Sequence, residues 1–514
     1  MENIYENIRL LQKHKLPEEQ ITVENNISID GEVEVKKVLS ASAKYDINFP
    51  LETLEKECNV GGNIILNVVY VTQDGEINNQ TAVSPFNCKI SNEQINANSK
   101  INARIKVVST DIDKVLANQI RVITTLNVEG VVVKNLEMPM LKEASGDLYI
   151  KQQEQEIVAF EKQNCDKFEE NMQAAVKDGV KKILMTNVET TVQNYTAGTN
   201  FIQVEGQLYA KVVYVNNQEI AELETITISK NFKQEIEAEG VNRDSIVDVI
   251  THVLNEHVQV ELEEKENNET IISLNIPIVA CYNLYECHKI LACQDVYSTE
   301  NIISVQKDEC INFVNLQPEF LEGKLEGNVV LTDEEPRVDK YVATTNVCSI
   351  VSNSYVDDGV LYVEGITTAN VIYLNDELGG LQSVQIEIPF VLDKKVDLNS
   401  DVLLESYVCL YDVDVMVKRG REIYFDAKAK AYVNVSRATN ICMVTKTENL
   451  EILPVKDSAL EIYFAKKGES FWDIAKNLKI PSEIIANQNP NLTDPLEKDE
   501  NIAIYYQKQR KLEH

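Results

Sequence analysis

One pattern occurs three times in this chain, and it restricts the fold more than any other feature of the sequence. The segments GGNIILNVVYV from Gly61, EGQLYAKVVYV from Glu205 and EGITTANVIYL from Glu364 share a glycine, a Val-Val or Val-Ile pair and a tyrosine. The shared residues are Gly62, Gly206 and Gly365, with Tyr70, Tyr214 and Tyr373. The copies lie about one domain length apart, so each predicts a domain and not one turn of a solenoid.

A second marker precedes each glycine at a nearly constant distance. It reads VKKVL from Val35, VKKIL from Val180 and VDKYV from Val338. A third echo, Asp147-Leu-Tyr149 and Asp295-Val-Tyr297, lies near the end of the first two copies. Two markers in one register make chance similarity a poor explanation, so we expect the three copies to adopt one fold.

The copies have the composition of β-strands. Their runs alternate with period two and are rich in Val, Ile, Thr and Tyr, as in QLYAKVVYV. Lys418 to Arg421, between two such runs, predicts a hairpin turn. The shared glycine predicts a bulge or close backbone approach, and the shared tyrosine a buried ring with a reachable hydroxyl; the alternative is a ligand site common to the copies. Glu154 to Val176 has helical composition, and we expect a linker helix or an insertion there.

The net charge of −33 argues against a nucleic-acid partner, which would need clustered Lys and Arg. Almost all of this charge precedes Asp457, and the C-terminal segment is nearly neutral. No apolar run is long enough for a signal peptide or a membrane span, so we expect a soluble, unexported protein. Residues 512–514, Leu-Glu-His, are expected to be a purification-tag remnant.

Ten cysteines are scattered along the chain without a Cys-x-x-Cys pair. We therefore expect ten reduced thiols, no disulfide and no metal. Cys281, Cys287, Cys293 and His288 could be drawn as a metal cluster, but six residues along a strand span roughly 20 Å. The expected role of these residues is structural.

The sequence gives little support for catalysis. The chain has five histidines, and no nucleophile-elbow, zinc-protease, phosphate-loop or dinucleotide-binding motif. Paired carboxylates such as Asp412 and Asp414 are explained by an acidic, solvated face. We therefore expect a protein that is not an enzyme and has no cofactor.

The C-terminal segment predicts a strand, two short helices and a strand. Glu461 to Phe464 forms the first strand, Gly468 permits a turn, and Ser470 caps a helix. The core stripe of that helix is Phe471, Ile474, Ala475 and Leu478, spaced at i, i+3, i+4 and i+7. Pro481 opens the second helix, Asn487 to Leu492 forms a turn, and Ile502 to Tyr505 the last strand. The expected fold class is mainly β: three repeated β-rich domains, then a small α+β domain of order βααβ.

This segment resembles the LysM module. The matching residues are Tyr463, Gly468, Glu469, Ser470, Trp472, Ile474, Ala475, Ile480, Asn487 and Pro490. The resemblance implies a shallow groove for N-acetylglucosamine chains, flanked here by Gly468 to Phe471 and Ile480 to Asn487. The sequence departs from the family with Glu469 and Ser470 for Asp and Thr, and with Asp499-Glu500 where a glycine is usual. These changes are compatible with the fold and weaken the case for glycan binding.

The repeats followed by a LysM module also resemble the SPOCS-domain family of endospore-forming bacteria. This resemblance implies a mother-cell morphogenetic scaffold at the forespore surface that supports coat localisation and binds a sporulation ATPase, stage IV sporulation protein A. In the cytosol a LysM module cannot reach peptidoglycan, so it would serve as a protein-binding surface. The implied domains are 1–150, 151–298 and 299–456, each SPOCS-like, and 458–508, LysM. The alternatives are a glycan-binding protein of the wall or spore cortex and, more remotely, a hydrolase.

We expect the partner-binding surface on one side of the LysM module. Its predicted residues are Lys466, Lys467, Gly468, Glu469, Ser470, Phe471, Trp472, Ile480 and Asn487. Trp472, the only Trp in the chain, lies off the apolar stripe of its helix and is the predicted anchor for the partner. The alternative is that Trp472 packs on the neighbouring repeat or on the LysM core.

Overall fold

The computed structural model of the chain is mainly β, as the sequence predicts. It describes residues 3–29, 33–116, 118–144, 146–218, 222–265, 269–399, 401–454 and 459–506. The expected tag remnant at residues 512–514 lies outside these ranges. Among the described residues, no helix has the length and apolar character needed to cross a bilayer.

The first eight strands form unit 1, which has two antiparallel sheets around one apolar core. In the first sheet, one edge of β8 pairs with β1 and then with β2, and the other edge pairs with β7. In the second sheet, one edge of β5 pairs with β3 and β4, and the other edge pairs with β6. The strands are β1 (Ile4–Lys15), β2 (Glu19–Ser28), β3 (Val35–Ile47), β4 (Glu52–Leu54), β5 (Glu57–Thr72), β6 (Ile77–Ser91), β7 (Lys100–Leu116) and β8 (Gln119–Glu143).

Unit 2 repeats this pairing around its own core. β15 takes the place of β8, the long strand β9 that of β1 and β2, and β13 with β14 that of β7. Its elements are β9 (Leu148–Val176), β10 (Val180–Ala197), β11 (Phe201–Asn216), β12 (Leu223–Glu237), β13 (Ile246–Val253), the short helix η1 (Asn255–His257), β14 (Gln259–Glu264) and β15 (Thr270–Ser298).

Unit 3 has the same pattern, with β22 as the long strand and a third separate core. Its strands are β16 (Asn301–Asn315), β17 (Glu319–Val330), β18 (Lys340–Asp357), β19 (Val360–Asn375), β20 (Gly380–Lys395), β21 (Val402–Lys418) and β22 (Glu422–Ile452). β9 begins at Leu148 and β16 at Asn301, close to the domain limits predicted at residues 151 and 299. Those limits stay predictions.

The repeated glycine and tyrosine occupy equivalent positions on β5, β11 and β19, as predicted. Each glycine lies directly opposite a phenylalanine on the next strand, and a Cβ atom there would overlap both this ring and a carbonyl oxygen of the preceding strand. The phenylalanines are Phe86, Phe232 and Phe390. The expected close backbone approach is therefore confirmed, because only glycine leaves room for the ring.

Two local predictions have opposite outcomes. The turn between β21 and β22 contains Arg419 and Gly420 with φ values of 54° and 69°, which confirms the predicted hairpin. The helix expected at Glu154 to Val176 is wrong, because this segment lies within β9 and pairs with β15 along its length. Glu154, Glu156, Lys167, Glu169 and Gln173 are exposed on a strand that β15 holds in register, whereas Glu170 is buried.

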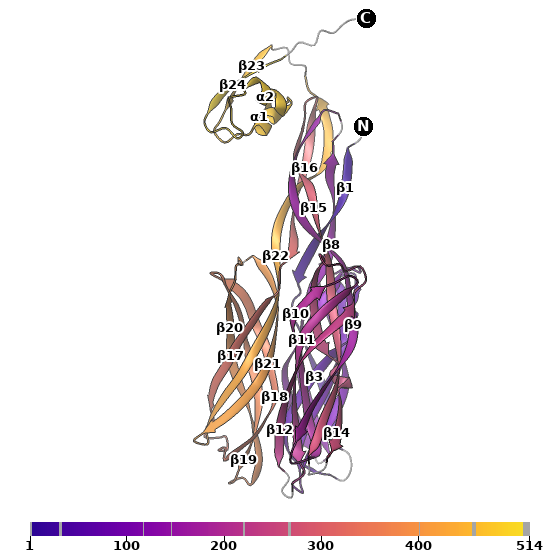
Figure 1. Cartoon of the computed structure of the whole chain (residues 1–514), viewed down its shortest axis with the longest axis vertical. Helices are drawn as coiled ribbons and strands as arrows, with labels where there is room; N and C mark the ends of the chain where they lie inside the picture. Colours follow the sequence, from indigo (N-terminus) through magenta and orange to yellow (C-terminus); the bar gives the residue numbers. More distant parts are fainter. Residues whose placement is uncertain are drawn as a thin grey trace.

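A stalk rises from the three units (Figure 1). It consists of three two-stranded ribbons, one per unit: β1 with the end of β8, the first half of β9 with the end of β15, and β16 with the end of β22. Apolar side chains from all three ribbons pack together along its inside, among them Leu10, Ala292 and Met443. The ribbons thus bury a common core that no single unit supplies.

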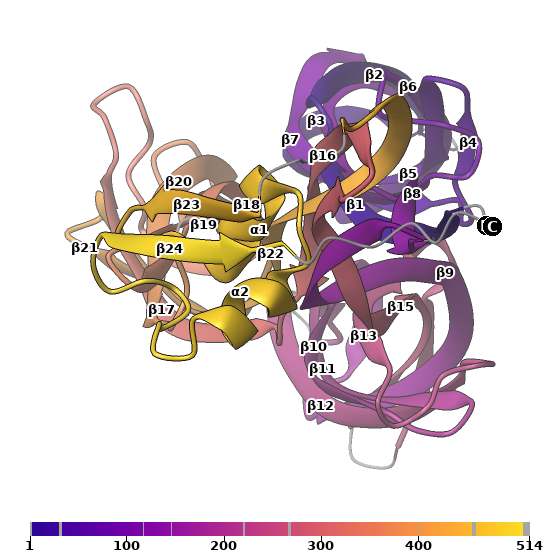
Figure 2. The same ribbon diagram turned by 90° about the horizontal axis from the view of Figure 1, so that it is seen from above.

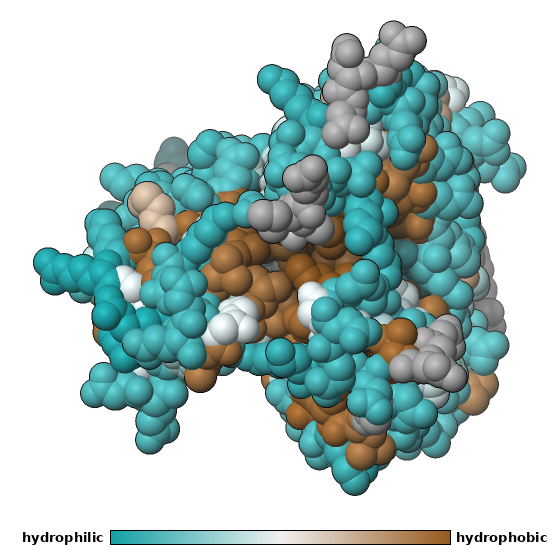
Figure 3. Space-filling view, turned by 90° about the horizontal axis from the view of Figure 1, so that it is seen from below, coloured by the Kyte–Doolittle hydropathy of each residue, from teal (hydrophilic) through white to brown (hydrophobic). Residues whose placement is uncertain are grey.

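Below the stalk the three units lie side by side, each at one corner of a triangle (Figure 2). At the ends of their strands far from the stalk, a cluster of apolar residues from all three units includes Leu39, Leu184 and Ala343. Viewed from below, apolar side chains gather in the middle of the molecule, between the units (Figure 3).

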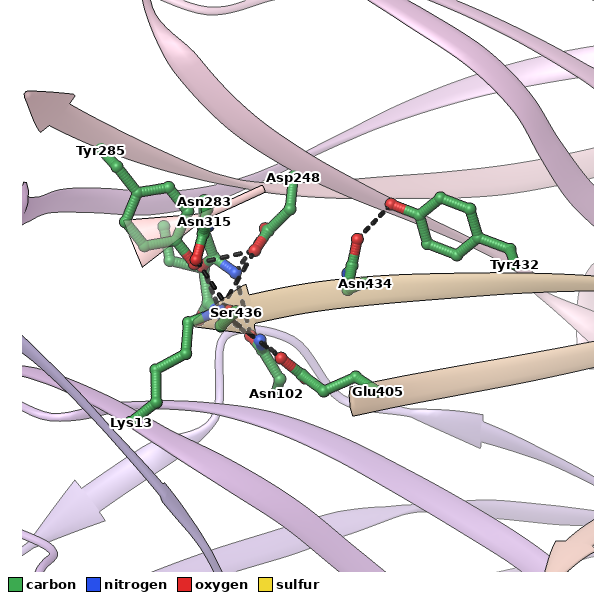
Figure 4. A network of polar contacts seen from close by, with 11 residues as sticks. Lys13, Asn102, Asp248, Asn283, Tyr285, Asn315, Glu405, Tyr432, Asn434 and Ser436 are labelled. Carbon is green, nitrogen blue, oxygen red and sulfur yellow. Dashed lines mark hydrogen bonds and ion pairs between the residues drawn. The ribbon is translucent and has the colours of Figure 1, made fainter. Parts of the chain in front are cut away.

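A buried polar cluster joins the units where the stalk begins (Figure 4). The Lys13 ammonium, with no exposed surface, lies 3.5 Å from a carboxylate oxygen of Glu405 and 3.9 Å from one of Asp248. Asn283 and Tyr285 each donate a hydrogen bond of 2.7 Å to Asp248. Unit 1 supplies the cation and units 2 and 3 one carboxylate each, so charge as well as apolar area ties the units together.

The expectation of ten free thiols is wrong. Cys165 and Cys281 lie directly opposite each other on β9 and β15 and form a disulfide, while the other eight cysteines are free. The sequence argument failed because these residues are 116 positions apart and only the pairing of β9 with β15 makes them neighbours. Cys287, His288 and Cys293 follow Cys281 along β15, and in the described part of the chain no group of three or more His, Cys, Asp or Glu could hold a metal.

Candidate functional site

The C-terminal module folds as its sequence predicts. It consists of β23 (Leu460–Ala465), α1 (Phe471–Leu478), α2 (Ser482–Gln488) and β24 (Glu500–Tyr505), with β23 and β24 antiparallel. The Ser470 hydroxyl accepts from the Asp473 backbone N–H, and the Asp473 carboxylate accepts from that of Ser470, which closes a capping box. Ile474, Ala475 and Leu478 are buried against Ile485, Ile502 and Ile504.

The module packs on the tip of the stalk through aromatic side chains. Tyr149 and Tyr297, the two tyrosines of the third sequence echo, pair across β9 and β15 and stack with their ring centroids 5.3 Å apart. The Tyr297 ring meets the Trp472 ring edge-on at 4.9 Å, and the Tyr297 hydroxyl donates to the Ile480 carbonyl oxygen at 2.8 Å. Tyr297 is fully buried by this contact.

Asp295, two residues before Tyr297, receives donors from two other parts of the chain. Its carboxylate accepts from Trp472 Nε1 at 2.9 Å and pairs with Lys476 Nζ at 2.8 Å and with Lys307 Nζ at 2.9 Å. Burial alone would raise the pKa of Asp295, but the bonds from Lys476, Trp472 and Lys307 lower it to about 2. The carboxylate is therefore ionised at neutral pH and links unit 2, unit 3 and the module.

The structure thus gives Trp472 an intramolecular role. Trp472 packs on the neighbouring repeat and partly against the LysM core, and its indole N–H donates to Asp295. The docked module thus has Trp472 in contact with the stalk tip, and the role of Trp472 as an anchor for a separate protein stays a prediction. The sequence placed Trp472 off the core stripe correctly, but it could not show that the stalk tip covers it.

The other predicted site residues do not form one surface. Residues 466–471 form a loop whose backbone is fixed by two carboxylates. The Lys467 N–H donates to Asp499, and the Phe471 N–H donates to Asp494. Ile480 is buried under the stalk tip, and Asn487 is exposed on α2. Ile480, one end of the expected glycan groove, is thus in contact with the stalk, as is the predicted anchor Trp472. The partner-binding role of the loop stays a prediction.

The structure adds a surface that the sequence analysis missed. Three alternate residues of β23 point away from the helices and are 46%, 53% and 74% exposed: Leu460, Ile462 and Phe464. Tyr505 on β24, opposite Leu460, is 62% exposed. We call these four residues the outer face of the module. The alternation in LEIYFA was a signal for it, but Tyr463 and Ala465 on the other face are also apolar, so the sequence did not tell inside from outside.

Two protein-family models match parts of this chain. Residues 179–263 match the SipL, SPOCS domain, and residues 463–496 match the LysM domain. The first match runs from the loop before β10 to β14 of unit 2, and the second covers the core of the module. No curated protein matches the chain, and no solved structure does. The chain therefore carries a SPOCS domain of the SipL type together with a LysM domain, the combination of a sporulation-related LysM protein.

Proposed function

We propose that this chain is a non-enzymatic scaffold of spore morphogenesis that binds a sporulation ATPase of the stage IV sporulation protein A type through its LysM module. On this proposal it acts in the mother cell at the forespore surface and supports localisation of the coat. SPOCS and LysM domains are non-catalytic binding domains, and their presence together in one chain supports a role in assembly.

One observation carries the proposed site: the outer face of the module is apolar and open. Contiguous exposed apolar side chains on a soluble domain mark interaction surfaces, whereas single ones do not. Leu460, Ile462, Phe464 and Tyr505 lie on two paired strands, away from the stalk tip. A protein surface would bury all four, whereas a sugar ring stacks its C–H face on aromatic side chains such as Phe464 and Tyr505 and would leave Leu460 and Ile462 uncovered. The outer face therefore favours a protein over peptidoglycan as the ligand.

The test is a pair of titrations of the purified full chain, one with the sporulation ATPase and one with peptidoglycan fragments. We expect the ATPase to bind, and Phe464→Ala to weaken this binding by roughly 2 kcal/mol, as truncation of a hot-spot residue does. Because Phe464 points outward, the melting temperature should hardly change. Val391→Ala, at a 57% exposed position on β20, is the matched control and should bind normally.

The same titrations separate the two candidate surfaces of the module. Lys467→Glu changes the 466–471 loop that the sequence predicts as the partner site, and Phe464→Ala changes the outer face. Loss of ATPase binding in Lys467→Glu alone would move the site to the loop. Binding of peptidoglycan fragments without binding of the ATPase would reject the scaffold proposal in favour of a glycan-binding protein.

A further inference from the structure

A cavity of about 300 Å³ lies between the three units, and each unit lines it with the same two strands of its fold. The walls come from β3 and β7 of unit 1, β10 and β13 of unit 2, and β18 and β21 of unit 3. A volume of 300 Å³ is at the lower end for small-molecule sites, which occur preferentially where domains meet. The position is therefore suited to a ligand, and the lining residues decide its class.

Three equivalent positions of the repeat bring different chemistry to this cavity. Lys44, Glu189 and Cys348 each lie three residues before the residue that pairs with the shared glycine of their unit. All three line the cavity and retain partial exposure. The same position of the repeat thus carries an ammonium in unit 1, a carboxyl group in unit 2 and a thiol in unit 3. Packing alone does not require ionisable groups at such a position, because buried charges cost free energy.

Two cations of the wall have donors to spare. Lys44 Nζ donates to the Thr186 carbonyl oxygen at 2.9 Å, and burial lowers the pKa of Lys44 to about 8 although Glu189 and Asp46 act against this. The Arg104 side chain is 18% exposed, lies over the Tyr407 ring, and reaches Glu129 only at 3.8 Å. Among the described residues, none accepts a hydrogen bond from the Arg104 guanidinium, which carries five N–H donors.

We propose that the cavity binds a small organic anion whose carboxylate or phosphate group is held by Arg104 and Lys44. A guanidinium presents its N–H groups in a planar fork that fits both groups, and an ammonium adds a point charge. Glu189 also lines the cavity and accepts from Cys409 Sγ at 3.1 Å. The part of the ligand that faces this carboxyl group must therefore be a donor, such as a hydroxyl or an ammonium.

This site would have a structural consequence as well. Arg104 and Lys44 belong to unit 1, Glu189 to unit 2, and Tyr407 and Cys409 to unit 3. We call units 1 to 3 with their stalk the body of the molecule. A ligand in contact with all of these residues stabilises the body by its binding free energy, because separate units would not bind it. The proposal does not depend on the partner of the LysM module.

The test is calorimetric titration of the purified full chain with citrate for the carboxylate arm and glycerol 3-phosphate for the phosphate arm. We expect saturable binding of at least one probe, weakened about tenfold or more by Arg104→Gln and by Lys44→Gln. Arg121→Gln is the matched control, since Arg121 pairs with Glu24 and Asp113 elsewhere on unit 1. Arg104→Lys keeps the charge without the planar fork, and circular dichroism checks that each variant is folded.

The comparison among variants is needed because multivalent anions also bind non-specifically to basic side chains on protein surfaces. An equal response of wild type, Arg104→Gln and Lys44→Gln would overturn the proposal and identify that general effect. Absence of saturable binding of both probes at about 10 mM would overturn it too, and would leave the proposed ATPase binding unaffected.

Discussion

Two junctions along the stalk hold this molecule together, and they are built in different ways. At the base, the Lys13 ammonium is fully buried between Asp248 and Glu405, and the three units meet around it. At the tip, Asp295 and Tyr297 hold the LysM module through contacts with Trp472 and Lys476, and Asp295 keeps 13% of its side-chain surface exposed. One junction is internal to the fold, and at the other Tyr297 of the stalk joins the apolar cluster of the LysM module.

This difference indicates which of the two junctions can separate while the three units stay folded. Separation at the base would expose a buried charge cluster and the apolar inside of the stalk, so it is equivalent to unfolding the body. Separation at the tip exposes a few aromatic rings and three charged groups that water solvates well. We therefore expect the body to behave as one cooperative unit and the LysM module to be releasable from it.

The largest effect is expected at the base, for Lys13→Met. This change leaves the Asp248 and Glu405 carboxylates buried without their cation, which costs about 3–5 kcal/mol of the free energy of unfolding. Urea denaturation followed by circular dichroism measures the loss. Lys13→Met combined with Glu405→Gln removes one of the two charges and should recover part of it. A wild-type midpoint for the single variant would show that the cluster does not hold the units together.

A smaller effect is expected at the tip, for Asp295→Ala. Loss of the charged hydrogen bonds should weaken docking of the LysM module by about 2 kcal/mol without shifting the unfolding of the body. Trp472 is the only Trp in the chain, so its fluorescence reports docking directly. We expect a red shift and stronger quenching by acrylamide. Glu309→Ala, an exposed carboxylate on β16 of the same stalk, is the control, and an equal red shift there would reject the role given to Asp295.

The smallest effect is expected from acidification. It distinguishes the two junctions because the pKa of the tip carboxylate is lowered and that of Glu405 at the base is raised. The pKa of Asp295 is lowered to about 2, so its contribution to docking is complete at neutral pH and is lost as the pH falls from about 4 toward 2. Burial raises the pKa of Glu405, partly offset by Lys13, so this carboxyl group gives no such loss at the base. Trp472 fluorescence in this range should change before the circular dichroism of the body does. The reverse order would contradict the comparison.

The sequence predicted the repeating part of this architecture because repetition exposes local rules. The glycine, the tyrosine and the VKK-type marker recur at equivalent strands, and the period-two patterns identify those strands as β. Ser470 as a cap and the apolar stripe likewise predicted the first LysM helix, and Pro481 predicted the start of the second. Phe86, Phe232 and Phe390 could have been found in the same way, since each follows its glycine at a nearly constant distance.

The rest could not be predicted because it arises between units. In the sequence QKHK, Lys13 looks like one more surface lysine, but Asp248 and Glu405, about 235 and 390 positions away, close over it. Cys165 meets Cys281, and Trp472 meets Asp295, only through long-range pairing and docking. The error at Glu154 to Val176 has a related cause, since tertiary pairing with β15 overrides the helical composition of β9.

The 31-residue strand β22 gives this molecule a mechanical property. β22 runs from the lower end of unit 3 to the tip of the stalk and continues from there into the chain of the LysM module (Figure 1). A pull on that module is therefore directed along β22, perpendicular to the hydrogen bonds that join it to β16, β17 and β21. Under such a pull these hydrogen bonds are loaded together in shear and do not break one after another. The contacts of Trp472 at the tip are weaker and break first, before β22 is loaded.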